Sequence, residues 1–268
     1  MDLVQAFVLG VLQGVSEFLP VSSTAHLVLA PWILGWTDPG LAYDVALHVG
    51  TLAAVIVYFR RDWMELAMGL LAAARERDLG AHPRARLALY LAAATVPAAA
   101  AGFLFEKLAA TTFRQPPVMA ATLALFGVVL YAADRWCAKR DTVDSLTLGR
   151  SLVIGLLQAL AIVPGVSRSG ITITGGLLFN MKREEAARFS FLLGAPVLGG
   201  AALLEATRIE PSSVFSSGFV AGVLTSAVFG FLSIRYLIRH VMTRDYAVFA
   251  WYRLVLAAVI TTLYFGFV

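Results

Sequence analysis

Long apolar segments dominate this chain and set the strongest limit on how it can fold. Six of them contain few charged side chains: 41–60, 86–106, 116–134, 185–207, 216–238 and 246–267. Each is close to the ~20 residues that a helix needs to cross the hydrocarbon core of a bilayer. They are apolar all round, whereas the helices of a water-soluble bundle keep a polar face. The sequence therefore predicts an all-α integral membrane protein with six transmembrane helices.

The composition agrees with this class. Hydrophobic residues make up 59% of the chain and charged residues only 14%, against roughly 25% charged residues in soluble domains. The net charge of +4 does not indicate a nucleic-acid partner, because the basic residues gather at the ends of the apolar segments. Membrane topology and anionic lipid headgroups account for basic residues at those places. We expect the bilayer, and no nucleic acid, as the partner.

Two further apolar stretches, 1–34 and 150–181, are interrupted by polar residues around Pro20 and Pro164. Proline removes a backbone donor and clashes with the preceding helical turn. Each stretch is therefore predicted to form a re-entrant helical hairpin, and the serine and threonine residues at 22–24 are candidates to cap the returning half-helix. Unwound backbone at membrane depth needs protein or water around it. A buried polar site is expected at these breaks.

The distribution of basic residues predicts the topology. The segments 61–85, 135–150, 182–188 and 239–245 hold most of the lysines and arginines, and the opposite side receives only Lys107, Arg114 and Arg208. Basic loops stay in the cytoplasm, so both termini are predicted outside. The first hairpin then enters from outside and the second from inside. The charged stretch 62–85 is expected to lie along the cytoplasmic interface.

The two broken stretches also resemble one another. Residues 8–13 (Val-Leu-Gly-Val-Leu-Gln) match residues 153–158 (Val-Ile-Gly-Leu-Leu-Gln), and each hairpin is followed by three predicted spans. Two similar units of opposite orientation form an inverted-topology repeat, whose broken helices meet near the bilayer midplane. We expect one membrane domain, with a first repeat at about 1–134 and a second at about 147–268.

Arg168 is the most informative single residue. A charged side chain at bilayer depth costs about 2.5–3.5 kcal/mol on insertion scales, so it normally has a partner and a role. Its neighbours are hydroxylated residues and glycine at a helix start, an environment that suits an oxyanion. The alternative is a buried ion pair with Glu17 that locks the two repeats together, and both roles are compatible with one another.

The first hairpin supplies complementary groups. Gln13 and Glu17 are four residues apart and share one helix face. A carboxylate beside an amide carbonyl suits a hard divalent cation, Mg²⁺ or Ca²⁺, although the same pair is compatible with a hydrogen bond to another helix. His26 alone is more typical of a structural histidine. Together with the serine hydroxyls, it predicts a nucleophile with its base.

These residues resemble a known family. The string at 13–26, Gln-Gly-Val-Ser-Glu-Phe-Leu-Pro-Val-Ser-Ser-Thr-Ala-His, is similar to the acidic motif of bacterial undecaprenyl-diphosphate phosphatases, the bacitracin-resistance family. The string at 164–172, Pro-Gly-Val-Ser-Arg-Ser-Gly-Ile-Thr, is similar to their second signature. The motifs, their separation and the spans between them cover nearly the whole chain.

The resemblance implies roles for individual residues. Ser23 or His26 is the expected catalytic centre, acting with Glu17 and Arg168, and direct attack by water is equally compatible with the sequence. Glu17 helps to hold a divalent metal, with Gln13 where many members have glutamate. The expected phosphate-binding residues are Ser22, Thr24, Ser167, Arg168, Ser169 and Thr172. His48 stands where the resemblance leads us to expect glutamine, and it shares a helix face with Asp44 in what we interpret as a supporting position.

The expected function is hydrolysis of undecaprenyl diphosphate to undecaprenyl phosphate and inorganic phosphate, which recycles the carrier lipid for cell-wall synthesis. The resemblance implies the bacterial inner membrane and a site open to its outer face. The alternative is a lipid-phosphate flippase or an anion transporter, because inverted repeats with broken helices are typical of transporters. The sequence leaves chain-length preference and a homodimer open.

Overall fold

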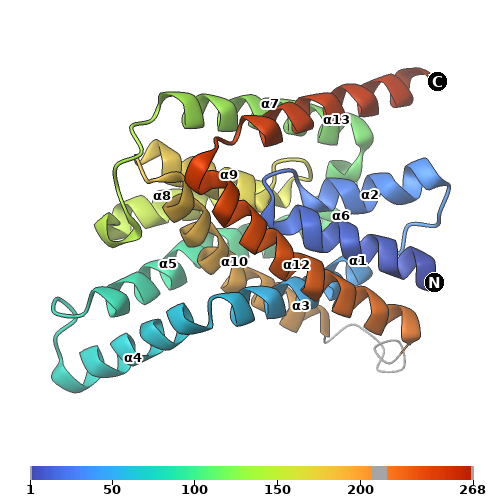
Figure 1. Cartoon of the computed structure of the whole chain (residues 1–268). Helices are drawn as coiled ribbons and strands as arrows, with labels where there is room; N and C mark the ends of the chain where they lie inside the picture. Colours follow the sequence, from blue (N-terminus) through green and yellow to red (C-terminus); the bar gives the residue numbers. More distant parts are fainter. Residues whose placement is uncertain (1, 207–215, 267–268) are drawn as a thin grey trace.

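The computed structural model describes residues 2–206 and 216–266. Two of the predicted spans end outside these residues, at positions 207 and 267. Arg208 also lies outside them. The elements are helices, shown in Figure 1: α1 Leu3–Phe18, α2 Ser23–Leu34, α3 Leu41–Tyr58, α4 Arg60–Glu76, α5 Pro83–Leu104, α6 Glu106–Ala110, η1 Thr112–Arg114, α7 Pro116–Trp136, η2 Val143–Ser145, α8 Leu148–Ala159, η3 Leu160–Ile162, α9 Arg168–Leu178, α10 Arg183–Ala206, α12 Ser217–Thr243 and α13 Ala247–Gly266.

Helices α5, α7, α10, α12 and α13 are long and apolar enough to cross a membrane. A sixth candidate is the pair α3 and α4, which passes the same test as one unit but is bent by 73° between Tyr58 and Arg60. These helices confirm a multi-pass, all-helical membrane protein. The charged stretch that we expected along the interface is mostly helix α4.

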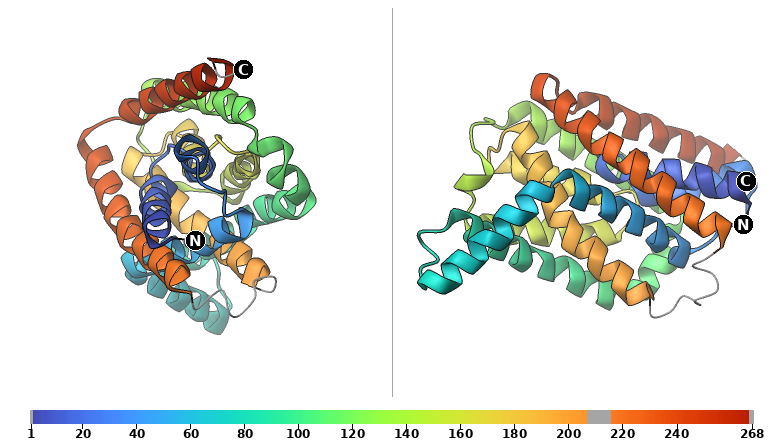
Figure 2. Two further views of the ribbon diagram at one scale, coloured as in Figure 1. Left: turned by 90° about the vertical axis from the view of Figure 1, so that its right-hand side faces the viewer. Right: turned by 60° about the horizontal axis from the view of Figure 1, so that its bottom comes forward.

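The short helices of the two broken stretches lie among the long helices, as the view along the bundle in Figure 2 shows. Helix α1 begins and α13 ends at the same end of the bundle. The loops that follow α4, α7 and α12 lie toward the opposite end (Figure 1). The segments predicted to share the cytoplasmic side therefore do lie together, away from the two termini.

Glycines bring the half-helices into backbone contact with long helices. A Cβ atom on Gly10 of α1 would lie 2.6 Å from the carbonyl oxygen of Gly222 on α12. A Cβ atom on Gly155 of α8 would lie 2.3 Å from the carbonyl oxygen of Ala94 on α5. Small residues are what close helix packing in a membrane requires. These contacts fix α1 and α8, which carry the two matching glutamines.

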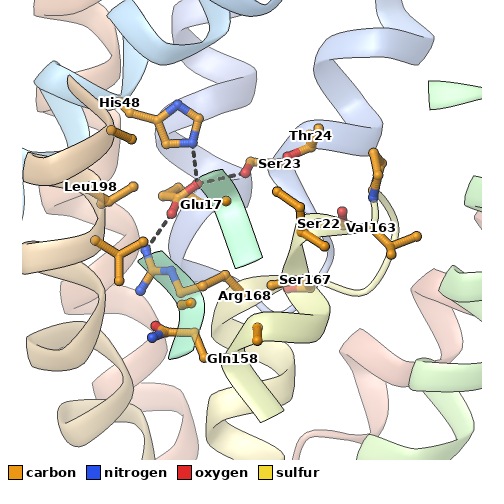
Figure 3. Close-up of a pocket in the computed structure, with 18 of the residues that line it drawn as sticks. Glu17, Ser22, Ser23, Thr24, His48, Gln158, Val163, Ser167, Arg168 and Leu198 are labelled. Carbon is orange, nitrogen blue, oxygen red and sulfur yellow. Dashed lines mark hydrogen bonds and ion pairs between the residues drawn. The ribbon is translucent and has the colours of Figure 1, made fainter. Parts of the chain in front are cut away.

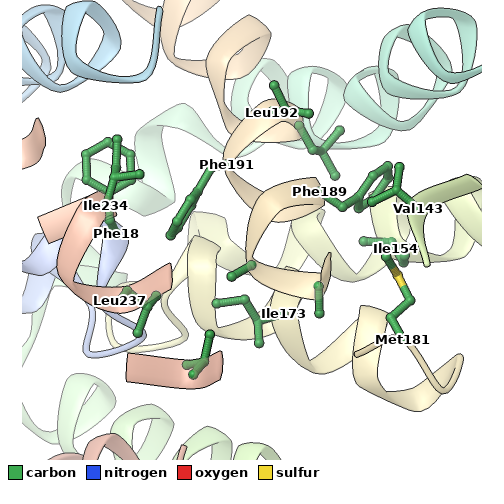
Figure 4. Packing of buried hydrophobic residues seen from close by; sticks show 14 of the residues in the cluster. Phe18, Val143, Ile154, Ile173, Met181, Phe189, Phe191, Leu192, Ile234 and Leu237 are labelled. Carbon is green, nitrogen blue, oxygen red and sulfur yellow. The ribbon is translucent and has the colours of Figure 1, made fainter. Parts of the chain in front are cut away.

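A large apolar cluster holds the end of α1 in place. Phe18 is fully buried and meets Phe191 of α10 edge-to-face, with ring centroids 5.2 Å apart. Ile234 and Leu237 of α12 belong to the same cluster, as Figure 4 shows. Because Phe18 directly follows Glu17, this packing also fixes the position of the carboxylate.

The helices break where proline predicts. Leu19, before Pro20, is extended with φ −67° and ψ 140°, because the residue before proline avoids the helical region. The returning helices start after Ser22 and Ser167, whose φ values are 74° and 70°. These sparsely populated conformations cost about 1–3 kcal/mol each. Each serine stands at the same distance along the chain from the matching glutamine of its own broken stretch.

The capping prediction is wrong for Ser22. Ser22 occupies the position before α2, but its hydroxyl makes no capping hydrogen bond. It accepts instead from the backbone N–H of Gly165 in the other break, at 3.0 Å. Ser167 does cap its helix, because its Oγ accepts from the N–H of Gly170 at 3.1 Å. The first serine therefore joins the two breaks rather than closing its own helix.

Candidate active site

An ion pair joins the two broken stretches. Glu17, in the last turn of α1, accepts a hydrogen bond at Oε1 from Nη2 of Arg168, the first residue of α9. Arg168 also donates from Nη1 to the backbone carbonyl of Ser190 on α10, at 3.2 Å. Glu17 is only 5% exposed, so its charge depends on this partner. The ion pair between Glu17 and Arg168, which the sequence offered as an alternative, is therefore present (Figure 3).

Three more side chains surround the other oxygen of the Glu17 carboxylate. Its Oε2 atom lies 2.7 Å from Ser23 Oγ, 3.2 Å from the amide nitrogen of Gln13 and 3.3 Å from Nε2 of His48. The Nδ1 atom of His48 lies 2.6 Å from the backbone carbonyl of Asp44. Because both ring nitrogens of His48 face acceptor oxygens, this geometry suits the doubly protonated ring. Two cationic groups around one carboxylate then leave a net positive site.

A cavity of about 250 Å³ opens beside this cluster. Its polar side chains are Glu17, Ser22, Ser23, Thr24, His48, Gln158, Ser167 and Arg168. Its apolar wall comes from α3, α5, α10 and η3, and includes Val45, Ala98, Gly102, Ile162, Val197, Leu198 and Ala201. A cationic polar side next to a hydrocarbon wall suits a ligand with an anionic head and an apolar tail.

Ser23 is paired with Glu17 and not with His26. The Nδ1 atom of His26 lies 2.7 Å from the backbone carbonyl of Ser22, and its Nε2 lies 2.7 Å from the hydroxyl of Tyr252 on α13. His26 is not among the residues that line the cavity. The structure therefore brings a serine hydroxyl to a carboxylate, and a catalytic role of His26 stays a prediction.

Residues 6–259 match the family model described as bacitracin resistance protein BacA. The chain belongs to this family. It is 50% identical to the undecaprenyl-diphosphatase of Moorella thermoacetica, over 98% of both chains. It is 46% identical to the undecaprenyl-diphosphatase of Pelobacter propionicus, over 95% of this chain and 94% of that protein. The family resemblance that the two motifs indicate is confirmed.

The three hydroxyl side chains of the second BacA-family motif have different surroundings, one at the cavity and two in the packing between elements. Ser167 lines the cavity. Ser169 donates to the backbone carbonyl of Leu19 at 3.2 Å. Thr172 donates to the carbonyl of its own helix at Arg168, 2.8 Å away, and its hydroxyl lies 2.6 Å from that of Ser190. Neither Ser169 nor Thr172 lines the cavity, so direct phosphate contact by these two hydroxyls stays a prediction.

The donors around Glu17 fit a divalent cation only in part. No group of three histidine, cysteine or carboxylate side chains that could hold a metal occurs in the described part of the chain. Gln13 Oε1 is buried and has no hydrogen-bond partner there, and it lies on the same side chain as the amide that contacts Glu17. Magnesium is commonly held by one or two carboxylates together with substrate phosphates. Glu17 and Gln13 fit such a site if the substrate completes it.

Arg253 is a buried charge that the sequence analysis missed. It lies on α13, is 0% exposed, and donates to the backbone carbonyls of Pro20, Gly165 and Val166 in the two breaks. An arginine inside a predicted span is itself a signal of a functional or structural role. The same reasoning that singled out Arg168 applies to it, but no motif drew attention to it.

Two more positions gained importance from the tertiary structure. A Cβ atom on Gly194 of α10 would lie 1.7 Å from Nη1 of Arg168, so any larger residue there would displace the guanidinium from its observed place. Asp44 pairs with Arg114 at 2.9 Å and approaches the site only through its backbone. Its neighbour one turn away, His48, is the residue that reaches Glu17.

Proposed function

We propose that this BacA-family protein hydrolyses undecaprenyl diphosphate to undecaprenyl phosphate and inorganic phosphate, and so recycles the carrier lipid for cell-wall synthesis. The family and the names of its close relatives support this activity. The observation that carries it is the contact of Ser23 and Arg168 with one buried carboxylate in one cavity. In this proposal Ser23 is the nucleophile, Glu17 its base and Arg168 the anion-binding group, which comes from a distant part of the chain.

Ser23 is our choice of nucleophile. Glu17 accepts the proton of the Ser23 hydroxyl, with which it is already hydrogen-bonded at 2.7 Å, while Ser23 Oγ forms a bond to the terminal phosphorus. The bond between that phosphorus and the bridging oxygen breaks, and undecaprenyl phosphate leaves. Water then hydrolyses the phosphoserine and releases inorganic phosphate. Arg168 and the positive end of α9 stabilise the charge on the phosphate oxygens during both steps.

The proposed divalent cation, Mg²⁺ or Ca²⁺, would be held by Glu17 and by the free amide oxygen of Gln13. When bound, it would neutralise phosphate charge and lower the barrier to displacement. The loops and the cavity wall are positioned by residues of the chain itself. Ser22 and Ser167 stabilise the loops through their hydrogen bonds, and Thr24 lines the cavity.

We place the molecule in the bacterial inner membrane as six spans and two re-entrant hairpins, in one domain of two inverted repeats. The cavity is proposed to open to the outer face. Its apolar wall supports this, because Val45 lies near the start of α3, while Gly102 and Ala201 lie near the ends of α5 and α10. These helix ends are on the side of the bundle that holds the two termini, which the distribution of basic residues predicts to be outside.

Release of inorganic phosphate in detergent tests the proposed function, with undecaprenyl diphosphate as substrate and with or without a chelator. We expect release by the parent protein, and losses of roughly 100-fold or more for Arg168→Ala and for Glu17→Ala. Tyr236→Ala, at an exposed position on α12, is the matched control and retains the parent rate. No release by the parent protein would favour the flippase or transporter, which needs no hydrolytic group. Parent-level release by both site variants would contradict the assignment of Glu17 and Arg168 to the hydrolytic site.

A further inference from the structure

Gln158 carries a buried amide that forms no hydrogen bond with Glu17 or with the side chains around it. It lies on α8, is 2% exposed, and lines the cavity with Ser167 and Arg168 (Figure 3). Neither its Nε2 nor its Oε1 has a hydrogen-bond partner within residues 2–206 and 216–266. Burying an amide without partners costs stability, and native proteins rarely leave such groups unpaired. Its place in the cavity wall indicates that a ligand supplies the partner.

The packing of α8 keeps this amide at the cavity. Gly155, one turn before Gln158, lies in backbone contact with Ala94 of α5, where an added Cβ would be 2.3 Å from the carbonyl oxygen. The chain then enters η3, whose Ala161 and Ile162 also line the cavity. Helix α8 therefore has little freedom to rotate Gln158 toward lipid.

Comparison with the first repeat explains why the side chain of Gln158 has no hydrogen-bond partner among the described residues. Its counterpart, Gln13, uses its amide nitrogen to contact Glu17 one turn later. The residue one turn after Gln158 is Ile162, which offers no acceptor side chain. In the first repeat the amide of Gln13 contacts a carboxylate, whereas the amide of Gln158 in the second repeat has no carboxylate to contact.

We propose that Gln158 is a substrate-binding residue that donates from Nε2 to an oxygen of the diphosphate, beside the oxygens that Arg168 contacts. This inference rests on the proposed function. A neutral amide adds N–H donors to the phosphate site without adding another cation to a low-dielectric cavity that already contains Arg168 and His48.

The test compares Gln158→Leu and Gln158→Glu with the parent in detergent. Leucine keeps a similar volume and removes both polar atoms, and glutamate is nearly isosteric but repels phosphate. Three quantities are measured: kcat/KM for phosphate release, the inhibition constant of inorganic pyrophosphate, and the thermal unfolding midpoint. We expect Gln158→Leu to lower kcat/KM about 10- to 100-fold and to raise the pyrophosphate inhibition constant by a similar factor. Gln158→Glu should lower kcat/KM further. Leu156→Ala, at an exposed position of the same helix, should match the parent.

The unfolding midpoint of Gln158→Leu should be unchanged or higher, since the change removes an unpaired buried amide. The proposal is overturned if both variants stay within about threefold of the parent in pyrophosphate inhibition. It is also overturned if activity falls only as far as the unfolding midpoint does, because that result means a structural role. If the parent releases no phosphate, the proposed function fails, and direct binding of pyrophosphate still tests Gln158 separately.

Discussion

Arg253 donates from Nη2 to the backbone carbonyl of Gly165 at 2.7 Å, which places a fully buried arginine of α13 against the second break. The same guanidinium donates to the carbonyl of Pro20 in the first break, at 3.3 Å. No carboxylate pairs with Arg253 in the described residues. Its charge is instead distributed over backbone carbonyls that the two unwound loops leave without helical partners.

Arg253→Met should therefore loosen both loops at once. The change keeps an apolar stem but leaves several buried carbonyls without donors, which predicts a loss of roughly 2–5 kcal/mol in the free energy of unfolding. Phosphate release should fall together with stability, because Ser23 and Arg168 directly follow the loops. Thermal unfolding in detergent measures the effect. Arg239→Met, at an exposed position of α12, serves as the control, and equal midpoints for the two variants would contradict the prediction.

Gly194→Ala should displace Arg168 without touching Ser23, the proposed nucleophile. The added methyl group would meet the guanidinium at 1.7 Å, whereas a Cβ on Gly200 of the same helix has no atom within 4 Å. We expect kcat/KM for phosphate release to fall roughly 100-fold in Gly194→Ala. Gly200→Ala should match the parent within about twofold. Equal activity of the two variants would show that Arg168 need not occupy its observed place.

Ser23→Ala and His26→Gln separate the two candidate nucleophiles. The Ser23 hydroxyl contacts Glu17, while both nitrogens of His26 are engaged by the Ser22 carbonyl and by Tyr252. We expect Ser23→Ala to reduce release roughly 100-fold or more, and His26→Gln to cause a smaller loss. Rapid quenching and peptide mass spectrometry of the parent should find phosphate on Ser23. Phosphate on His26, or full activity of Ser23→Ala, would contradict the assignment.

Gln13→Glu should strengthen the proposed cation site. It places a second carboxylate beside Glu17, where Gln13 now contributes a neutral oxygen, and hard cations bind more tightly to more negatively charged ligands. The Mg²⁺ concentration that gives half-maximal phosphate release should fall by about 3- to 10-fold. Titration of chelator-treated protein measures this midpoint. An unchanged midpoint would mean that Gln13 does not approach the cation, and Gln5→Glu, a glutamine in the first turn of the same helix, is the control.

The position of both breaks could be predicted because proline and its neighbours act locally. Leu19 is extended for a reason that lies in Pro20 alone. The charge of Arg168 at bilayer depth likewise predicted a partner, since the cost of an unpaired arginine there does not depend on the details of the fold. That partner is Glu17, as the sequence led us to consider.

His48, Gly194 and Arg253 were underestimated or missed because their importance depends on what faces them. His48 reaches Glu17 only because α3 packs beside α1. Gly194 has no local requirement for glycine and is needed only because the guanidinium of Arg168 occupies the space of its side chain. The distance of Ser23 from His26 along the chain suggested a catalytic pair. The orientation of α2 turned His26 toward Tyr252 instead.

By itself, the sequence determined the membrane class, the helical segments, the two breaks and the family, because hydropathy, proline geometry and motifs are properties of neighbouring residues. Only the tertiary structure decided which oxygen of Glu17 meets which donor, which histidine enters the site, and which buried amide is left without a partner. Those outcomes depend on the approach of helices distant in sequence, and that approach is set by glycine contacts and apolar packing that no single segment contains.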